Sequence, residues 1–296
     1  MLAIYRRELK SYFTSVIGWV FIAFFLILVG LYFMVYNLMN GYTDFSPVFS
    51  GVELFFILLL VPVLTMRIIA EENRQKTDQL LYTSPVSITK IILGKYLALI
   101  TLSGIAMLVV CLYPLILSGL VEQVATGTEA VDFAIAYGSI LGFFLLGAAY
   151  IAIGMFISSL TESQVIAAVA SGVIMIFTYL MTSLAGLLPS GHTFVFWFLA
   201  VLILVLSVGL YYWIHNGWLA GIIGVLAEAA LVILFLLKTE SFDGLIGNVL
   251  SQISITDRYQ NFTYGIFDVS ALVYYISVAF LFVFITIQRI KKKRFN

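Results

Sequence analysis

Charge is scarce in this chain. Lysine, arginine, aspartate and glutamate make up 10% of the 296 residues, whereas apolar residues make up 62% and the mean hydropathy is +1.11. Ordinary soluble domains carry about 25% charged residues, and a soluble fold of this length could not hide so much apolar surface. The composition therefore excludes a soluble protein and predicts an integral membrane protein.

Cysteine and catalytic motifs are also lacking. The single cysteine, Cys111, lies in an apolar stretch, so neither an internal disulfide nor a cysteine-based metal site is available. His192 and His215 are expected on opposite sides of the membrane and cannot share a metal. The motifs HExxH, GxSxG and GxxxxGK[ST] are absent. We therefore expect no catalytic residue, no metal, no bound cofactor and no nucleic-acid partner, and no ATP hydrolysis by this chain alone.

Long apolar runs are what the sequence does contain. A helical span needs about 20 mostly apolar residues, whereas the strands of a membrane barrel alternate apolar and polar residues. The continuous runs here predict an all-α integral membrane protein with about eight transmembrane helices. These are expected near residues 17–36, 53–70, 91–119, 133–158, 164–187, 195–214, 218–237 and 270–288.

The distribution of lysine and arginine predicts the orientation, because these residues are enriched in cytoplasmic loops. If the N-terminus is cytoplasmic, thirteen of the fifteen basic residues fall on that side, and only Lys238 and Arg258 fall outside. Both termini are then cytoplasmic, in agreement with an even number of spans. The longest outer segment, 238–269, is expected to be extracytoplasmic, and its mixed pattern is consistent with a short surface helix.

The first sixteen residues have an amphipathic pattern that precedes the first span. Arg6, Arg7 and Lys10 lie opposite an apolar face, so we expect a helix over 1–16 that lies along the cytoplasmic interface. The apolar face consists of Tyr5, Leu9, Tyr12, Phe13 and Val16.

A charged, helix-capable segment, 71–84, separates the second and third expected spans. Its charged residues are Glu71, Glu72, Arg74, Lys76 and Asp78. Leu80 and Leu81 add an apolar edge, and Pro85 follows the segment. The segment is either a solvated loop or a docking surface for a partner. Its length, and its position directly between two spans, favour docking.

Glu228 is the one acid expected near the middle of a span. A carboxylate in hydrocarbon is costly, so it should face protein or water, or be protonated. It could be a proton or cation site, or a buried acid hydrogen-bonded to a neighbouring helix. The absence of a basic residue from every other span centre favours the second explanation. Glu53, at the outer edge of the second span, is expected at the membrane interface.

The segment at 71–84 and the residues after it resemble the permease subunits of type-2 (ABC-2) ABC exporters, especially the branch that includes the gliding-motility permease. Those permeases carry E-E-x(3–4)-G-T-x-E-x-L-L-x-x-P-V-S and then G-K-x-L-A. The counterparts here are Glu71-Glu72, Thr77, Leu80-Leu81, Pro85-Val86-Ser87 and Gly94-Lys95-Tyr96-Leu97-Ala98. Lys76 stands where glycine is usual, and Gln79 where glutamate is usual.

Two further stretches extend the resemblance. Residues 153–164, which include Glu162, resemble the family's inner turn between two spans and supply a second cytoplasmic contact point. Residues 265–275 and the basic tail resemble the last span of the gliding-motility branch. Because it includes the pair of spans at 195–237, the chain is expected to have more spans than is usual in the family.

The resemblance implies a single ABC-2 type permease domain over 1–296, in a multi-pass protein of a bacterial or archaeal cell membrane. Two permease chains, identical or homologous, would work with two ATP-binding subunits that hold ATP and Mg²⁺. The segment 71–84 would be the coupling helix, and the complex would export a substrate or extract it from the membrane. An extracytoplasmic accessory subunit is compatible with this arrangement. The implied ATPase contacts are Glu71, Glu72, Arg74, Lys76, Thr77, Gln79, Leu80, Leu81, Pro85 and Glu162.

Two other functions stay open at the level of sequence. An ion-coupled secondary transporter would use Glu228 and would need no ATPase. A membrane anchor of a surface complex would need no transport at all. The sequence does not identify a substrate.

Overall fold

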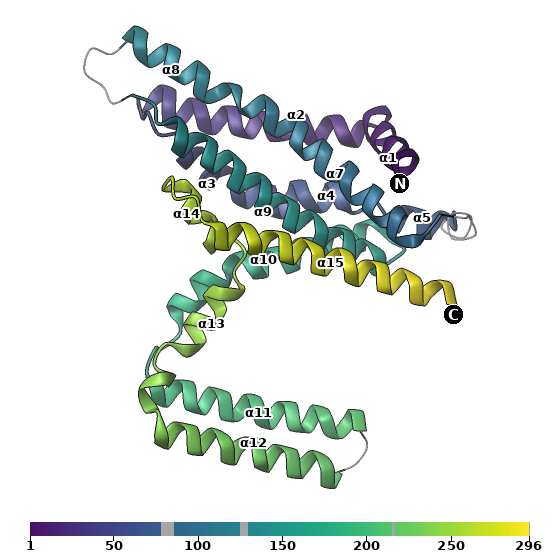
Figure 1. The fold of residues 1–296 in the computed structure, drawn as a ribbon, viewed down its shortest axis with the longest axis vertical. Helices are drawn as coiled ribbons and strands as arrows, with labels where there is room; N and C mark the ends of the chain where they lie inside the picture. Colours follow the sequence, from purple (N-terminus) through teal and green to yellow (C-terminus); the bar gives the residue numbers. More distant parts are fainter. Residues whose placement is uncertain (78–85, 125–129, 215–216, 296) are drawn as a thin grey trace. The chain divides into compact units, whose positions relative to one another are not determined.

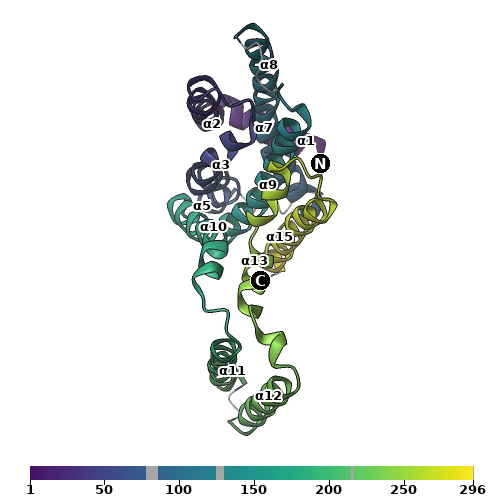
Figure 2. The ribbon, with the colours of Figure 1, turned by 90° about the vertical axis from the view of Figure 1, so that its left-hand side faces the viewer.

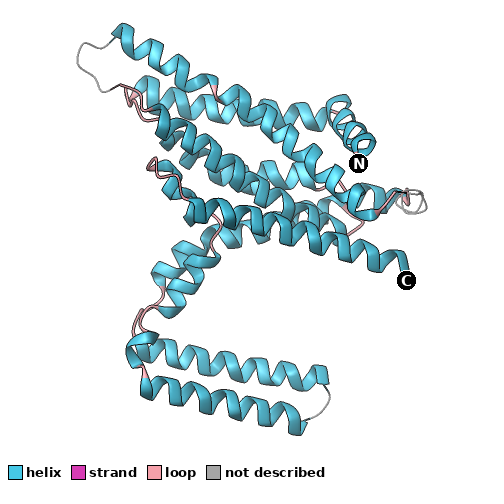
Figure 3. Ribbon diagram, viewed as in Figure 1, coloured by secondary structure: helices cyan, strands magenta, loops and turns pink. Residues whose placement is uncertain are grey.

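The computed structural model describes residues 1–77, 86–124, 130–214 and 217–295, and it consists of helices joined by short loops (Figure 3). No strand occurs in these ranges. Seven of the described helices are long and apolar enough to cross a membrane. The chain is an all-α integral membrane protein, as the apolar runs predicted.

The candidate spans correspond to the predicted ones. They are Val16–Met39, Ser46–Gln75, Ile88–Val121, Phe133–Leu160, Gln164–Met181, His192–Tyr212 and Val269–Lys293. The eighth expected span, 218–237, lies in a helix whose part Gly221–Leu237 is apolar but shorter than these seven. The second and third spans contain breaks, at 66–69 and at Cys111. The sequence predicts kinks in these same two spans, near Pro62 and Pro114, because proline removes one intrahelical hydrogen bond.

The contacts divide the chain into two compact units, residues 1–179 with 258–296 and residues 180–257. The first unit begins with α1 (Leu2–Thr14) and α2 (Val16–Phe33), which continues as the π-helix η1 (Met34–Met39). Its second span comprises α3 (Ser46–Phe55), the π-helix η2 (Phe56–Leu60), α4 (Val61–Thr65) and α5 (Ala70–Gln75). Its remaining elements are α7 (Ile88–Val110), α8 (Leu112–Val124), α9 (Phe133–Leu160), the start of α10 (Gln164–Leu187), η4 (Asp257–Tyr259), α14 (Gln260–Thr263) and α15 (Val269–Phe295) (Figure 1).

Helix α9 is the centre of the first unit, because glycines on it allow neighbouring helices to approach closely. A Cβ added at Gly154 would collide with Thr65 of α4, and one added at Gly142 would collide with the ring of Phe262. The ring of Phe143 lies 4.7 Å from that of Phe49, centroid to centroid. Small residues at helix contacts are the usual means of close packing in membranes.

Glu53 is buried, which the sequence did not predict. It is only 6% exposed and lies between Phe49 and Phe56, two of the aromatic residues that contact Phe143. The acid is therefore buried inside the first unit, and its position at the depth of the membrane interface stays a prediction. Its place at the outer end of the span concealed the burial, because burial by a helix distant in sequence leaves no local pattern.

The second unit is built on two apolar helices, α11 (His192–Ile214) and α12 (Gly217–Leu237), which lie side by side (Figure 2). Gly224 of α12 faces Ser207 of α11, where an added Cβ would meet the serine Cβ at 2.9 Å. The unit also contains η3 (Thr239–Phe242) and α13 (Leu245–Ile253), a short helix within the segment 238–269. Its small core consists of Val195, Phe242 and Ile246.

Candidate functional site

The first turn of α5 is hydrogen-bonded to the end of α9 through a buried serine. The Oγ of Ser158 accepts hydrogen bonds from the backbone N–H groups of Ile69 at 3.3 Å and Ala70 at 3.1 Å. The same hydroxyl donates to the carbonyl of Met66 at 3.1 Å. The first N–H groups of a helix have no partner within the helix. Ser158 supplies that partner from a neighbouring helix.

Asn73 connects α5 to two further places. Its Nδ2 donates to the carbonyl of Thr161, just after α9, at 3.4 Å. Its Oδ1 accepts a hydrogen bond from Nζ of Lys293, near the end of α15, at 3.1 Å. Asn73 is only 6% exposed. One side-chain amide thus holds together three segments that lie far apart in the sequence.

Lys95 of α7 is the most buried charge of this region, with 1% of its surface exposed. Its Nζ lies 2.8 Å from Oε1 of Glu72, 3.4 Å from Oε1 of Glu8 and 2.9 Å from the carbonyl oxygen of Ile68. An ammonium group has three N–H donors, so these contacts satisfy all of them. Lys95 therefore joins α7 to α1, to the turn before α5 at Ile68, and to α5 itself at Glu72.

Arg7 of α1 contacts the same two acids. Its Nη2 lies 2.7 Å from Oε1 of Glu8 and 3.1 Å from Oε1 of Glu72. Arg7 and Lys95 thus form a closed ring of four ion pairs with Glu8 and Glu72. The ring connects α1, α5 and α7.

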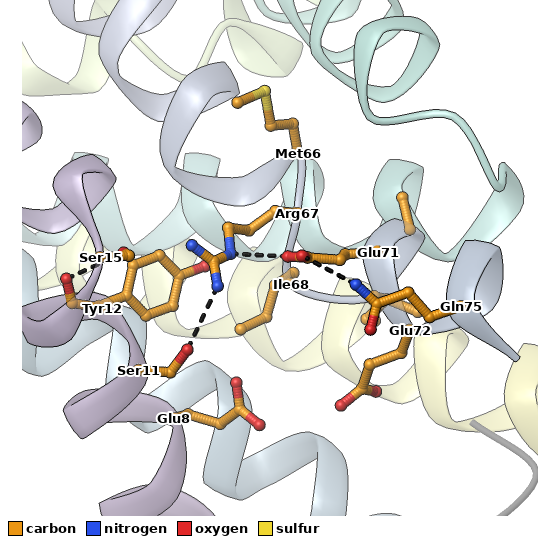
Figure 4. A network of polar contacts seen from close by, with 12 residues as sticks. Glu8, Ser11, Tyr12, Ser15, Met66, Arg67, Ile68, Glu71, Glu72 and Gln75 are labelled. Atoms are coloured by element: carbon orange, nitrogen blue, oxygen red, sulfur yellow. Dashed lines mark hydrogen bonds and ion pairs between the residues drawn. The ribbon is translucent and has the colours of Figure 1, made fainter. Parts of the chain in front are cut away.

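A fifth ion pair, between Arg67 and Glu71, lies beside this ring, and Figure 4 shows it together with the ring's acids Glu8 and Glu72. Arg67 Nε lies 2.8 Å from Oε2 of Glu71, and its Nη2 donates to Oγ of Ser11 at 3.2 Å. Its guanidinium also lies over the ring of Tyr12, 5.5 Å from the centroid. Tyr12 donates from its hydroxyl to the carbonyl of Leu64 at 3.0 Å. Helix α1 is therefore attached to α4 at Leu64 and to the turn before α5 at Arg67.

The environment changes the pKa of two groups on α1. Burial raises the pKa of Glu8, but the positive charges of Lys95 and Arg7 lower it more, so the net shift is downward and the carboxylate stays ionised. Burial raises the pKa of Tyr12 far above its usual value, and the hydroxyl stays neutral as a donor. Both groups are therefore held in the protonation states that their observed contacts need.

A polar cleft of about 340 Å³ lies within this network. The acids that line it, Glu8, Glu71 and Glu72, are balanced by the bases Arg7, Arg67 and Lys95. Because the charges cancel, the cleft offers no excess charge to an ion. Its arrangement is suited to holding helices together and to transmitting movement between them.

The end of α5 is exposed. Gln75 and Thr77 still line the cleft, and Gln75 Nε2 donates to Oε1 of Glu71 at 3.2 Å, whereas Arg74 and Lys76 do not line it. Arg74, Gln75, Lys76 and Thr77 are exposed, whereas Glu71 and Glu72 are half-buried and paired within the chain. Glu162 is exposed and directly follows Thr161, the residue bonded to Asn73. Two predicted contact points, α5 and the turn after α9, are therefore adjacent. Four other residues of the predicted coupling surface, Gln79, Leu80, Leu81 and Pro85, lie outside the described residues.

The helix predicted over 71–84 is interrupted at Lys76, and residues 78–84 lie outside the described part of the chain. Helix α5 begins at Ala70 and ends at Gln75, because Lys76 adopts a left-handed conformation with φ 54° and ψ 20°. Among the non-glycine residues described, Lys76 alone has a positive φ. Glycine, the residue usual at this position in the permeases that the sequence resembles, takes this conformation at no steric cost.

We predict that Lys76→Gly stabilises the end of α5 locally by about 1 kcal/mol, because the left-handed conformation costs a side-chain-bearing residue about that much. Amide hydrogen exchange of residues 73–77 should slow by roughly fivefold, the factor that this free energy represents. The control is Gln75→Gly, inside α5, which should speed exchange because glycine weakens a regular helix. Faster exchange in Lys76→Gly would contradict the prediction.

The sequence did not predict the importance of Glu8, Lys95, Ser158 and Asn73 as a group. Lys95 gave one signal, since a charge inside an apolar span must have a partner. The other three gave none, because their partners lie on distant segments.

Glu228 lies in α12 and is half-exposed. It forms no hydrogen bond or ion pair with any residue that the structure describes, so no basic group or second acid converges on it there. Within the same described ranges, no group of three or more histidine, cysteine, aspartate or glutamate side chains could hold a metal ion.

Comparison with known proteins gives a family match. The family model described as "ABC-2 family transporter protein" matches residues 35–238, which is more than half of the chain and includes α5, Lys95 and Ser158. No curated protein matches the chain, and neither does any solved structure.

Proposed function

Because the chain belongs to the ABC-2 family of transporter proteins, in which the membrane subunit is not itself the ATPase, we propose how it is driven. Separate ATP-binding subunits dock on the segment 71–84 and on the adjoining turn at Glu162. ATP-driven movement of those subunits then shifts α5 and, through it, the membrane spans. The complex exports a substrate or extracts it from the membrane.

The observation that carries this proposal is the two-sided character of α5. Its outer side presents Arg74 and Lys76, which are exposed and do not line the cleft. On its inner side, Glu72 forms an ion pair with Lys95, and Asn73 forms a hydrogen bond with Thr161. A ligand shifts a conformational equilibrium only through contacts that differ between the two states. A push on the outer side of α5 would change contacts on α1, α7, α9 and α15 together.

The same contacts support the proposed orientation. Arg7 of α1 pairs with Glu72, and Lys293 of α15 bonds to Asn73, so both ends of the chain meet α5. Both termini therefore belong on the side where the ATP-binding subunits dock, which is the cytoplasmic side of a bacterial or archaeal cell membrane. A second permease chain, identical or homologous, completes the proposed complex, and ATP and Mg²⁺ bind to the partner subunits. The sequence motifs favour the gliding-motility branch of the family.

The test is affinity purification of the full chain in mild detergent from its native cells. We expect an ATP-binding subunit to co-purify and its ATPase activity to rise in the complex. Leu80→Asp/Leu81→Asp should abolish both the co-purification and the rise in ATPase activity. Two charges in the apolar edge of the docking surface should lower the affinity for the partner by at least about tenfold.

The matched control is Glu228→Gln in the second unit, which should keep the partner and its stimulation. If Leu80→Asp/Leu81→Asp retains both as fully as the wild type, the docking assignment is wrong. If the purified chain alone transports in proteoliposomes and Glu228→Gln does not, the chain is an ion-coupled transporter instead.

A further inference from the structure

The end of α15 carries a group of basic residues at the point where its membrane span ends. The helix runs unbroken over Val269–Phe295, and the candidate span within it is Val269–Lys293. Arg289, Lys291, Lys292 and Lys293 are all exposed. Several cations therefore lie together at one end of a hydrophobic helix.

Three of these cations have no acidic partner within the part of the chain that the structure describes. The ion pairs found there involve other bases, and none includes Arg289, Lys291 or Lys292. By contrast, all three bases of the α5 network are paired. The charge at the end of α15 is therefore available to a group outside the chain.

The position of Lys291 and Lys292 on the helix indicates what that group is. Leu281 is 51% exposed and Phe284 is 46% exposed, so this face of α15 presents apolar side chains outward. Lys291 follows Phe284 by seven residues, and Lys292 follows Leu281 by eleven. At 3.6 residues per turn these spacings place both lysines on the same outward face. Val283, Ile287 and Ile290 form the buried face instead.

We propose that Lys291 and Lys292 form a binding site for the phosphate groups of anionic phospholipids, in the leaflet at the C-terminal end of α15. The outward apolar face contacts the acyl chains, and the lysine stems extend along it so that their ammonium groups reach the headgroups. Clusters of basic residues directly after a span attract anionic lipid in this way. The continuous apolar face favours lipid over an acidic protein surface, which would have to cover Phe284 as well.

Lys293 connects this lipid site to α5. It lies on the same helical turn as Lys291 and Lys292, and its Nζ bonds to Oδ1 of Asn73 at 3.1 Å. Lipid bound to its neighbours restrains that turn and so restrains Asn73. Anionic lipid therefore stabilises the position of α5, and the charge of the membrane acts on the segment proposed to couple transport to ATP. This last step rests on the proposed function, whereas the lipid site does not.

The first experiment measures lipid preference by electron paramagnetic resonance. The full chain is placed in phosphatidylcholine vesicles with spin-labelled phosphatidylglycerol or spin-labelled phosphatidylcholine. The wild type should prefer the anionic probe, and Lys291→Gln/Lys292→Gln should lose that preference by up to about fivefold for each lysine removed. Lys291→Arg/Lys292→Arg keeps the charge and should keep the preference.

Arg74→Gln/Lys76→Gln serves as the charge-matched control, because it removes two exposed cations from the same side of the protein. If that variant loses as much preference as Lys291→Gln/Lys292→Gln, only net charge is at work and the site is wrong. If the Lys291→Gln/Lys292→Gln variant keeps its preference but no longer co-purifies with an ATP-binding subunit, the occupant is a protein.

The second experiment tests the link to α5 by amide hydrogen exchange in bilayer discs. Exchange over residues 70–77 should be slower in discs containing phosphatidylglycerol than in phosphatidylcholine discs. Lys293→Met, which keeps the apolar stem and removes the donor, should abolish the difference while leaving the lipid preference in place. Equal exchange of the wild type in both discs would overturn the link. Neither the measurement of lipid preference nor that of hydrogen exchange needs an ATPase, so failure of either is distinguishable from failure of the proposed function.

Discussion

Replacing Lys95 with methionine should destabilise the protein by about 3 kcal/mol, because removing one partner of a buried ion pair leaves the other charges uncompensated. Lys95 is 1% exposed, and Glu8, which it contacts at 3.4 Å, is 9% exposed. Arg7 would remain as the partner of both acids. The expected loss of stability is therefore at the lower end of the range usual for a broken buried ion pair. The measurement is the apparent Tm of the purified chain in detergent, which should fall by several degrees.

The matched control is Lys90→Met on the same helix, where the lysine is exposed and should contribute less than about 0.5 kcal/mol. The double variant Glu72→Gln/Lys95→Met should lose less than the sum of the two single variants, because the two residues share an ion pair. Additive losses, or equal effects of the substitutions at 90 and 95, would show that the pair contributes nothing.

Replacing Ser158 with alanine should lower the free energy of unfolding by about 2 kcal/mol or more. The hydroxyl is the partner of the backbone N–H groups of Ile69 and Ala70. Each buried donor left without a partner costs about 1–3 kcal/mol. The substitution also removes the bond to the Met66 carbonyl. Because these groups begin α5, the apparent Tm should fall and hydrogen exchange over 69–75 should rise. In the complex, stimulation of the ATPase should weaken as well.

Ser159→Ala is the control for this prediction. Ser159 is also buried, but its hydroxyl donates to the carbonyl of Phe156 within the same helix, so its removal leaves no backbone donor orphaned. Ser159→Ala should lower the free energy of unfolding by less than about 1 kcal/mol. The assignment of Ser158 fails if the two alanine variants have the same Tm and the same exchange over α5.

The elements that the sequence predicted are those with a repeated local pattern. Continuous apolar runs predicted the spans, and the alternation of apolar and charged residues over 1–16 predicted α1. Both depend on residues a few positions apart. The charged segment at 71–84 was recognised for the same reason, although helix α5 ends at Gln75 and residues 78–84 lie outside the described ranges.

What the sequence could not predict is the pairing across long separations. Lys95 and Glu8 are 87 positions apart, and Lys293 and Asn73 are 220 apart. No periodicity connects such residues, since their proximity follows from how α1, α7, α9 and α15 pack. Glu71 and Glu72 illustrate the difference between what a local pattern predicts and what pairing between distant residues produces. Their place on a polar segment suggested an outward role, but the structure pairs both with bases of this chain.

The ring formed by Arg7, Glu8, Glu72 and Lys95 has a consequence for the path by which α5 could move. Each acid contacts both bases, and each base contacts both acids. Glu72 can therefore leave Lys95 while it still holds Arg7, or leave Arg7 while it still holds Lys95. The helix could be displaced by successive exchange of partners, and no intermediate would contain an isolated charge. If α5 moves between two positions, such a ring would lower the barrier between them, because Glu72 keeps one base as its partner throughout.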